Sequence, residues 1–133
     1  MTSHEKFEYW LDIAEYDLAT AQAMFDSGRW LYVTFMCQQA VEKLCKGLYN
    51  LYIDDNLPRI HNIRSIIRKY ADLLPMQVTE DQCLFFDKLT AFYLEGRYPE
   101  HTQKLSELVH ESEAGDILSR AKEEFAWLLA QKP

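Results

Sequence analysis

Hydrophobic residues recur every three or four positions along most of the chain, which is the spacing of one face of an α-helix. Two long stripes of this kind come first. The first comprises Phe7, Trp10, Leu11, Ala14, Leu18, Ala21 and Phe25, and the second comprises Val33, Cys37, Ala40, Leu44, Leu48 and Leu51. The period-two alternation that is typical of strands is absent. The pattern therefore predicts an all-α protein.

Start and stop signals bound these two helices. Thr2 to Glu5 has the Thr-x-x-Glu form of a capping box, and Gly28 is a suitable stop after the first stripe. The second helix is expected from Trp30 to about Ile53, where turn-forming residues and Pro58 follow.

Three further helices are expected in the second half of the chain. One carries apolar residues from Ile63 to Leu74 and closes at Pro75. The next begins with a capping box at Thr79, carries Phe85, Phe86, Leu89, Phe92 and Tyr93, and stops at Gly96 or Pro99. From 99 to 115 the pattern weakens into a short helix or loop, and the last helix spans 116–131. The prediction is one domain over residues 1–133, an up-and-down bundle of about five helices whose first two are long and antiparallel.

Composition supports a packed, soluble domain. The chain has 133 residues, 48% of them hydrophobic, and a formal net charge of −7. An acidic balance counts against non-specific binding to long nucleic acids, although a local basic cleft is compatible with it. The N-terminus has no apolar signal-peptide region, and no apolar run reaches membrane-spanning length, so a cytoplasmic protein is expected. The three cysteines, Cys37, Cys45 and Cys83, are expected to be buried reduced thiols.

Polar residues gather at two places in the middle of the chain. Gln39, Glu42, Lys43 and Lys46 share one face of the second helix. This face is either solvated, with a Glu42–Lys46 pair, or part of a ligand site. Residues 59–69 hold four basic side chains and no acid. Within them Arg64 and Arg68 are one helical turn apart, and they form either an anion site or an ordinary basic face.

A charged residue also interrupts the chain between two helix-breaking residues. Arg97 and Tyr98 lie between Gly96 and Pro99, and His101 follows closely. The sequence fits either a helix end with a surface arginine or a guanidinium positioned to bind phosphate. The common catalytic motifs, including HExxH and the P-loop, are missing, and no two histidines have the spacing of a helical metal pair. We therefore expect no metal site and no cofactor.

Several pieces of the chain together resemble the HEPN domain (higher eukaryotes and prokaryotes nucleotide-binding domain). The segment AEYDLATAQAMFDSGRWLYVTFMCQQAVEKLCKGLY is similar to its first two helices, with QQAVEKLCK as the signature of the second. Its helix-1 pattern is matched by Trp10, Ala14, Asp17, Leu18 and Ala21. LPRIHNI resembles the element that opens the third helix, and GRYPE resembles the Arg-Tyr-Pro motif.

The resemblance implies a helical bundle that is usually a homodimer. It also implies a minimal nucleotidyltransferase as partner, in a toxin–antitoxin module. Members of the family are either non-catalytic nucleotide- or RNA-binding proteins or metal-independent endoribonucleases that use Arg-x(4–6)-His. On the first reading, the ligand cleft would include Gln39, Lys43, Lys46, His61, Arg64, Arg68, Arg97 and Tyr98. On the second, Arg97 and His101 would be catalytic.

One departure from the family pattern bears on catalysis. Only three residues separate Arg97 from His101. The tyrosine that partner enzymes modify would correspond to Gln103, which has no phenolic oxygen. A third alternative is a non-catalytic dimeric module that docks a protein partner. It would use an exposed apolar patch, for which the candidates are Trp30, Tyr32, Tyr49 and Tyr52.

Overall fold

The computed structural model describes residues 1–53, 56–57, 59–94 and 104–133. Its α-helices are α1 (Ser3–Asp26), α2 (Trp30–Tyr52), α3 (Ile63–Arg68), α4 (Glu80–Thr90) and α5 (Glu111–Ala130). The 3₁₀ helix η1 (Ala71–Leu73) lies between α3 and α4, and η3 (Leu105–Glu107) lies between α4 and α5. No strand occurs within these ranges, so the predicted all-α fold class is confirmed.

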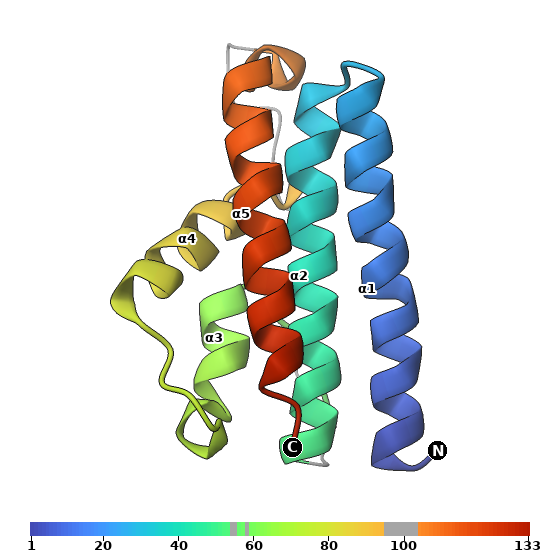
Figure 1. Cartoon of the computed structure of the whole chain (residues 1–133), viewed down its shortest axis with the longest axis vertical. Helices are drawn as coiled ribbons and strands as arrows, with labels where there is room; N and C mark the ends of the chain where they lie inside the picture. Colours follow the sequence, from blue (N-terminus) through green and yellow to red (C-terminus); the bar gives the residue numbers. More distant parts are fainter. Residues whose placement is uncertain (54–55, 58, 95–103) are drawn as a thin grey trace.

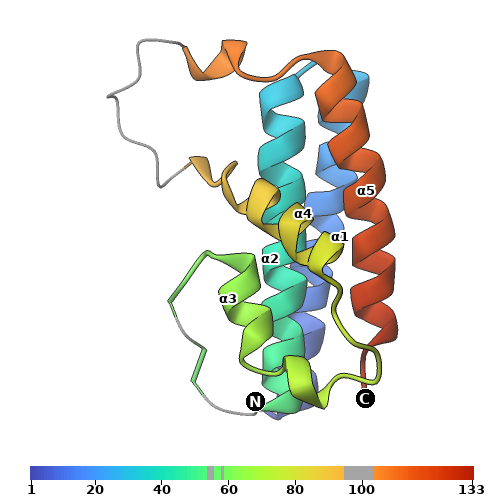
Figure 2. The ribbon, with the colours of Figure 1, turned by 90° about the vertical axis from the view of Figure 1, so that its left-hand side faces the viewer.

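Three long helices stand side by side and the two shorter ones lie against them (Figure 1). α1 runs antiparallel to α2, as predicted, and α5 runs in the same direction as α2. Both chain termini lie at the same end of the bundle (Figure 2). None of the helices that the structure describes is long and apolar enough to cross a bilayer.

α2 is the central helix of the bundle. It packs against α1, α3, α4 and α5, and more than half of its residues are buried. A helix with neighbours on most sides must bury nearly its whole circumference, including its polar positions. The approach of α1 is particularly close, because a Cβ atom added at Gly47 would lie 3.1 Å from both Phe7 and Trp10.

The helix starts agree with the capping signals in the sequence. The side chain of Thr2 accepts from the backbone N–H of Glu5 at 3.1 Å, and Glu5 accepts in return from the N–H of Thr2 at 2.9 Å. Thr79 and Gln82 form the same reciprocal box at the start of α4. Gly28 follows α1 with a φ of +73°, a conformation that glycine adopts at little cost.

Three expected boundaries are wrong. The helix expected from Ile63 to Leu74 divides into α3 and η1, because Tyr70 turns inward and donates to the carbonyl of Cys45 at 2.8 Å. α4 ends at Thr90 instead of Gly96 or Pro99. There the Thr90 hydroxyl donates to the carbonyl of Phe86 and accepts from the N–H of Ile63, and such side-chain bonds compete with helix continuation.

α5 begins at Glu111, five residues before the expected start at Asp116. Gly115, the residue just before the expected start, lies inside this helix. A Cβ atom added there would lie 3.3 Å from the ring of Phe25. Gly115 therefore allows close packing between α5 and the end of α1.

The expected apolar docking patch on α2 is also wrong. Tyr49 is buried, Trp30 packs edge-on against Phe25 with ring centroids 5.3 Å apart, and Tyr52 stacks on Tyr70. Of the four candidates only Tyr32 is exposed, at 54%. These aromatic residues are covered because α2 packs against four other helices. Its contacts therefore extend beyond its one apolar stripe and also bury polar residues of α2.

Candidate functional site

The polar face of α2 is largely inside the protein. Glu42 is only 3% exposed, and Gln38 beside it is completely buried. The predicted Glu42–Lys46 pair is present, but the interpretation of this face as solvated is wrong for Glu42. A carboxylate removed from water must be paired and hydrogen-bonded, since its desolvation is otherwise very unfavourable.

Glu42 is the centre of a network that satisfies this requirement. Its Oε1 accepts from the amide of Gln38 at 2.7 Å, and its Oε2 accepts from the ammonium of Lys46 at 3.1 Å. The same Oε2 lies 3.1 Å from Nδ1 of His61, and Gln39 donates to the Gln38 oxygen at 2.8 Å. We call this set, together with Tyr93, the Glu42 network.

His61 connects the buried carboxylate to the surface. Its ring stacks on that of Tyr93, with centroids 4.1 Å apart, and the Tyr93 hydroxyl lies 3.1 Å from Nε2. An ionised carboxylate can only accept, so Nδ1 of a neutral His61 ring carries the proton, and Nε2 accepts from Tyr93. The His61 side chain is 44% exposed, so this end of the network reaches solvent.

A second ion pair links α1 to the same side of α2. The ammonium of Lys43 lies 2.5 Å from Oδ2 of Asp17, which is only 8% exposed. Lys46 also lies over the ring of Trp10, 5.7 Å from its centroid. Both lysines predicted to bind a ligand thus have a carboxylate partner, and the two positive charges are balanced by Asp17 and Glu42.

The two arginines of α3 have different surroundings from the lysines. Arg64 donates to Asp87 at 2.8 Å and to both oxygens of Glu80 at 3.1 Å, on the side that faces α4. The hydrogen bond to Asp87 is the main cause of a raised pKa for Arg64, so its positive charge is firmly held. Arg68 is exposed and lines a pocket between α3 and α4.

The structure therefore divides the predicted ligand residues. It connects Gln39, Lys46 and His61 through Glu42, places Lys43 on the same helix beside them, and directs Arg64 elsewhere. Arg97, Tyr98 and His101 lie outside the described residues, as do Gly96, Pro99 and Gln103. No cluster of three or more potential metal ligands occurs among the residues that the structure describes.

Comparisons with known proteins identify the family. A family model of the HEPN domain matches residues 7–131. This chain belongs to the HEPN domain family. A HEPN domain has a nucleotide-binding or ribonuclease-type fold. A search of curated proteins gives no match.

Two solved structures share the HEPN fold of this chain. One is TT1696 from Thermus thermophilus, which is 23% identical, with a TM-score of 0.80 over 95% of this chain and 98% of that one. The other is ST0689, described as an archaeal HEPN homologue. It is 24% identical, with a TM-score of 0.76 over 96% of this chain and 98% of that one. At these identities the likeness establishes the fold alone.

Sequence reasoning did not predict the contacts of three residues, namely Asp17, Gln38 and Tyr93. Asp17 lies between Ala14 and Ala21 on the buried face of α1. That placement was the available signal, because a charge within an apolar stripe needs a partner on the facing helix. Gln38 and Tyr93 gave no comparable signal, since their roles depend on contacts with Glu42 and His61.

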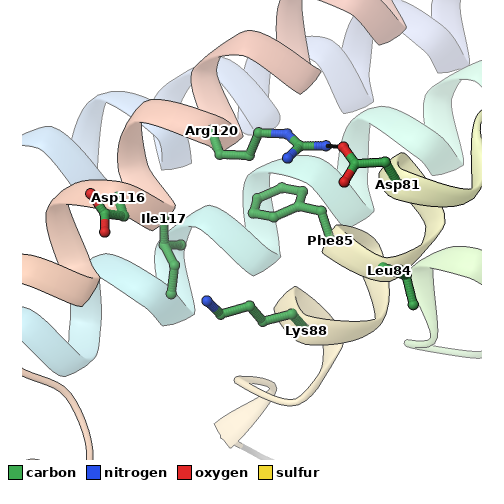
Figure 3. A pocket seen from close by; sticks show the side chains of 7 residues that line it. All are labelled: Asp81, Leu84, Phe85, Lys88, Asp116, Ile117 and Arg120. Atoms are coloured by element: carbon green, nitrogen blue, oxygen red, sulfur yellow. Dashed lines mark hydrogen bonds and ion pairs between the residues drawn. The ribbon is translucent and has the colours of Figure 1, made fainter.

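A groove with charged residues in its wall lies between α4 and α5 and has a volume of about 310 Å³ (Figure 3). On its wall Arg120 donates to Asp81 and to the buried Glu124, each at 2.7 Å, and Gln82 donates to Glu124 at 2.9 Å. We call these four residues the Glu124 network. The groove is lined by two acids and two bases, so it carries no excess charge that would attract a phosphate.

Proposed function

We propose that this HEPN domain binds a nucleotide or RNA at the surface end of the Glu42 network, with Arg97 as the principal phosphate ligand. The observation that carries the proposal is the chain of contacts from buried Glu42 through His61 to Tyr93. Buried ionic networks are seldom the most stable filling for a protein interior. This network ends on a partly exposed histidine, a side chain that can exchange protons or bind a ligand near neutral pH.

The network also lies next to the Arg-Tyr-Pro segment in the chain. Arg97 follows Tyr93 by four positions, so the stacking of His61 on Tyr93 holds the chain near the start of that segment. A guanidinium binds phosphate oxygens through paired hydrogen bonds, and the ring of Tyr98 offers a surface on which a base can stack.

The other predicted residues receive different roles in this proposal. Lys43 and Gln39 line the ligand side of α2 and are half-buried. Lys46 neutralises Glu42, and it orients the network more than it binds ligand. Arg64 joins α3 to α4 through Asp87 and Glu80, and a ligand would have to displace both acids to use it.

The proposed active unit is a homodimer that works with a minimal nucleotidyltransferase, as in relatives that form toxin–antitoxin modules. Tyr32 supports a contact with a second copy, because it is 54% exposed on α2, the helix that carries the network. Light scattering should give twice the 15.7 kDa mass of one chain. A monomer at micromolar concentration would contradict the dimer.

Replacing Arg97 by alanine tests the binding site directly. Arg97→Ala should weaken the binding of ATP or a short single-stranded RNA, measured by calorimetry, by about tenfold or more, since a charge-assisted contact is lost. The thermal midpoint should stay nearly unchanged. Arg29→Ala is the matched control, because Arg29 is exposed and its side chain makes no capping bond. Equal binding by both variants, or none by the wild type, would refute the proposal.

The second candidate function is a metal-independent endoribonuclease. It is favoured by the presence of Arg97 and His101 in one short segment. His101 would take the proton from a ribose 2′-hydroxyl. The 2′-oxygen would then attack phosphorus to form a 2′,3′-cyclic phosphate, and the 5′-oxygen would leave as a hydroxyl with a proton from water, while Arg97 would stabilise the added negative charge. Cleavage of RNA in EDTA that is lost in His101→Ala would support this activity. Cleavage that persists in that variant, or an inert wild type, would exclude it.

A further inference from the structure

A small pocket lies between α4 and the segment of α3 and η1, and none of its lining residues belongs to the Glu42 network. Its volume is about 190 Å³. Its apolar wall is formed by Ile67, Ala71, Val78 and Phe86. Figure 2 shows α3 and α4 on one side of α2, joined by the loop that contains η1. Pockets for drug-sized ligands are commonly 300 Å³ or more, so this one suits a smaller molecule.

Two guanidinium groups line this pocket beside its apolar wall, and they differ in their partners. Arg64 is committed to Asp87 and Glu80. Arg68 is exposed, and within the described part of the chain it forms no ion pair. The pocket thus combines an apolar interior with one guanidinium that is available to an anion.

The pocket wall also restricts the chemistry of the buried part of a ligand. Apart from the two arginines and the thiol of Cys83, every lining side chain is a hydrocarbon. A nucleobase placed there would lose hydrogen bonds to water without replacing them, which is unfavourable. An alkyl chain or a simple aromatic ring loses none.

We propose that this pocket binds a small amphipathic anion, with its apolar body against Ile67 and Phe86 and its single charged head on Arg68. Burial of the body supplies most of the binding free energy, and the guanidinium supplies selectivity for an anionic head. The site shares no residue with the Glu42 network or with Arg97. A test of ligand binding in this pocket is therefore independent of the proposed nucleotide or RNA binding.

Cys83 provides a built-in reporter for this pocket. It is half-buried in the pocket wall, whereas Cys37 and Cys45 are completely buried in the core. Burial raises the pKa of Cys37 to about 12 and raises that of Cys45 further, so both remain unreactive thiols near neutral pH. A disulfide reagent such as DTNB should therefore react first at Cys83.

The experiment measures the rate of this reaction with three probes of matched chemistry. Octanoate supplies both tail and charge, 1-octanol supplies the tail alone, and acetate supplies the charge alone. Octanoate should protect Cys83 at a concentration about tenfold lower than 1-octanol, which reflects one charge-assisted contact, and acetate should not protect. Equal protection by octanoate and octanol, or no protection by octanoate, would overturn the proposal.

Two substitutions locate the charged head. Arg68→Gln should abolish the preference for octanoate over 1-octanol while leaving protection by octanol unchanged. Lys69→Gln removes the same charge from the next residue, which is exposed and does not line the pocket, and it should retain the preference. An unaltered preference in Arg68→Gln, or an equal loss in both variants, would refute the role of Arg68.

Discussion

Among the described residues two glutamates are buried, Glu42 in α2 and Glu124 in α5, and each is the centre of a polar network. In the Glu124 network every member lies on α4 or α5, and Arg120 at its outer end pairs with the exposed Asp81. These contacts hold α4 and α5 together, and at the outer end the charges of Arg120 and Asp81 balance each other. The Glu42 network instead leaves the helices, because it reaches His61 and Tyr93 in irregular segments.

The two networks thus use a buried charge differently. The Glu124 network holds two helices together, whereas the Glu42 network orients side chains that reach the surface. Gln82 completes a capping box while it donates to Glu124, so each contact of that network has a local structural role. Glu42 instead orients an imidazole and a phenol, which are groups that can exchange protons or bind a ligand.

The largest effect concerns the dry interior in which Glu42 lies. Burial raises the pKa of Cys37 to about 12 and also raises that of Cys45, on the same helix as Glu42. Above about pH 8.5 the unfolded chain loses thiol protons that the folded protein keeps. The free energy of unfolding should therefore fall by about 1.4 kcal/mol per pH unit for each thiol between about pH 9 and 11.

Urea unfolding at a series of pH values measures this slope. In Cys45→Ala the free energy of unfolding should fall less steeply with pH, by about 1.4 kcal/mol per pH unit, because one thiol no longer contributes. A stability independent of pH over this range would mean that water reaches the core beside Glu42, and the description of its surroundings as a dry interior would be wrong.

The next effect compares the two glutamates themselves. Glu42→Ala leaves Lys46 and Gln38 without their acceptor inside the protein, and it should lower the free energy of unfolding by about 3 kcal/mol. Glu124→Ala should lower it by only about 1 kcal/mol, because Arg120 is 30% exposed and still pairs with Asp81. Urea unfolding at pH 7 measures both. Equal losses would remove the energetic distinction between the networks.

A smaller effect compares one ion pair from each region. A double-mutant cycle on Asp17 and Lys43, whose side chains are 12% and 22% exposed, should give a coupling of about 1 kcal/mol. The cycle on Asp81 and Arg120 should give about 0.3 kcal/mol, because the Asp81 side chain is 79% exposed. Added salt should weaken the second coupling more than the first. The reverse order would show that burial does not separate the two regions.

The sequence predicted the fold where local signals and packing agree. The capping boxes at Thr2 and Thr79 and the stop at Gly28 are set by nearby residues, and the structure has all three. α5 starts earlier than the weakening pattern indicated, and it includes Gly115 although glycine is a weak helix former. The close approach of Phe25, ninety positions earlier, explains why a glycine lies inside the helix. Contacts of that separation cannot be read from a local pattern.

The candidate site was predictable only in part for the same reason. The shared face of Gln39, Glu42, Lys43 and Lys46 follows from helical spacing alone. Its burial depends on how many helices surround α2, and the contact from Glu42 to His61 spans nineteen positions. The roles assigned to Arg97, Tyr98 and His101 stay predictions.

The most direct test of the account compares Glu42→Gln with Glu124→Gln in binding a short single-stranded RNA, by fluorescence anisotropy at a temperature where both variants are folded. Each substitution keeps the size of the side chain and removes one buried charge. Glu42→Gln should weaken binding by about tenfold, since His61 loses its charged partner, whereas Glu124→Gln should bind as the wild type does. Wild-type affinity in Glu42→Gln, or the same loss in both variants, would contradict the claim that the Glu42 network orients the binding site.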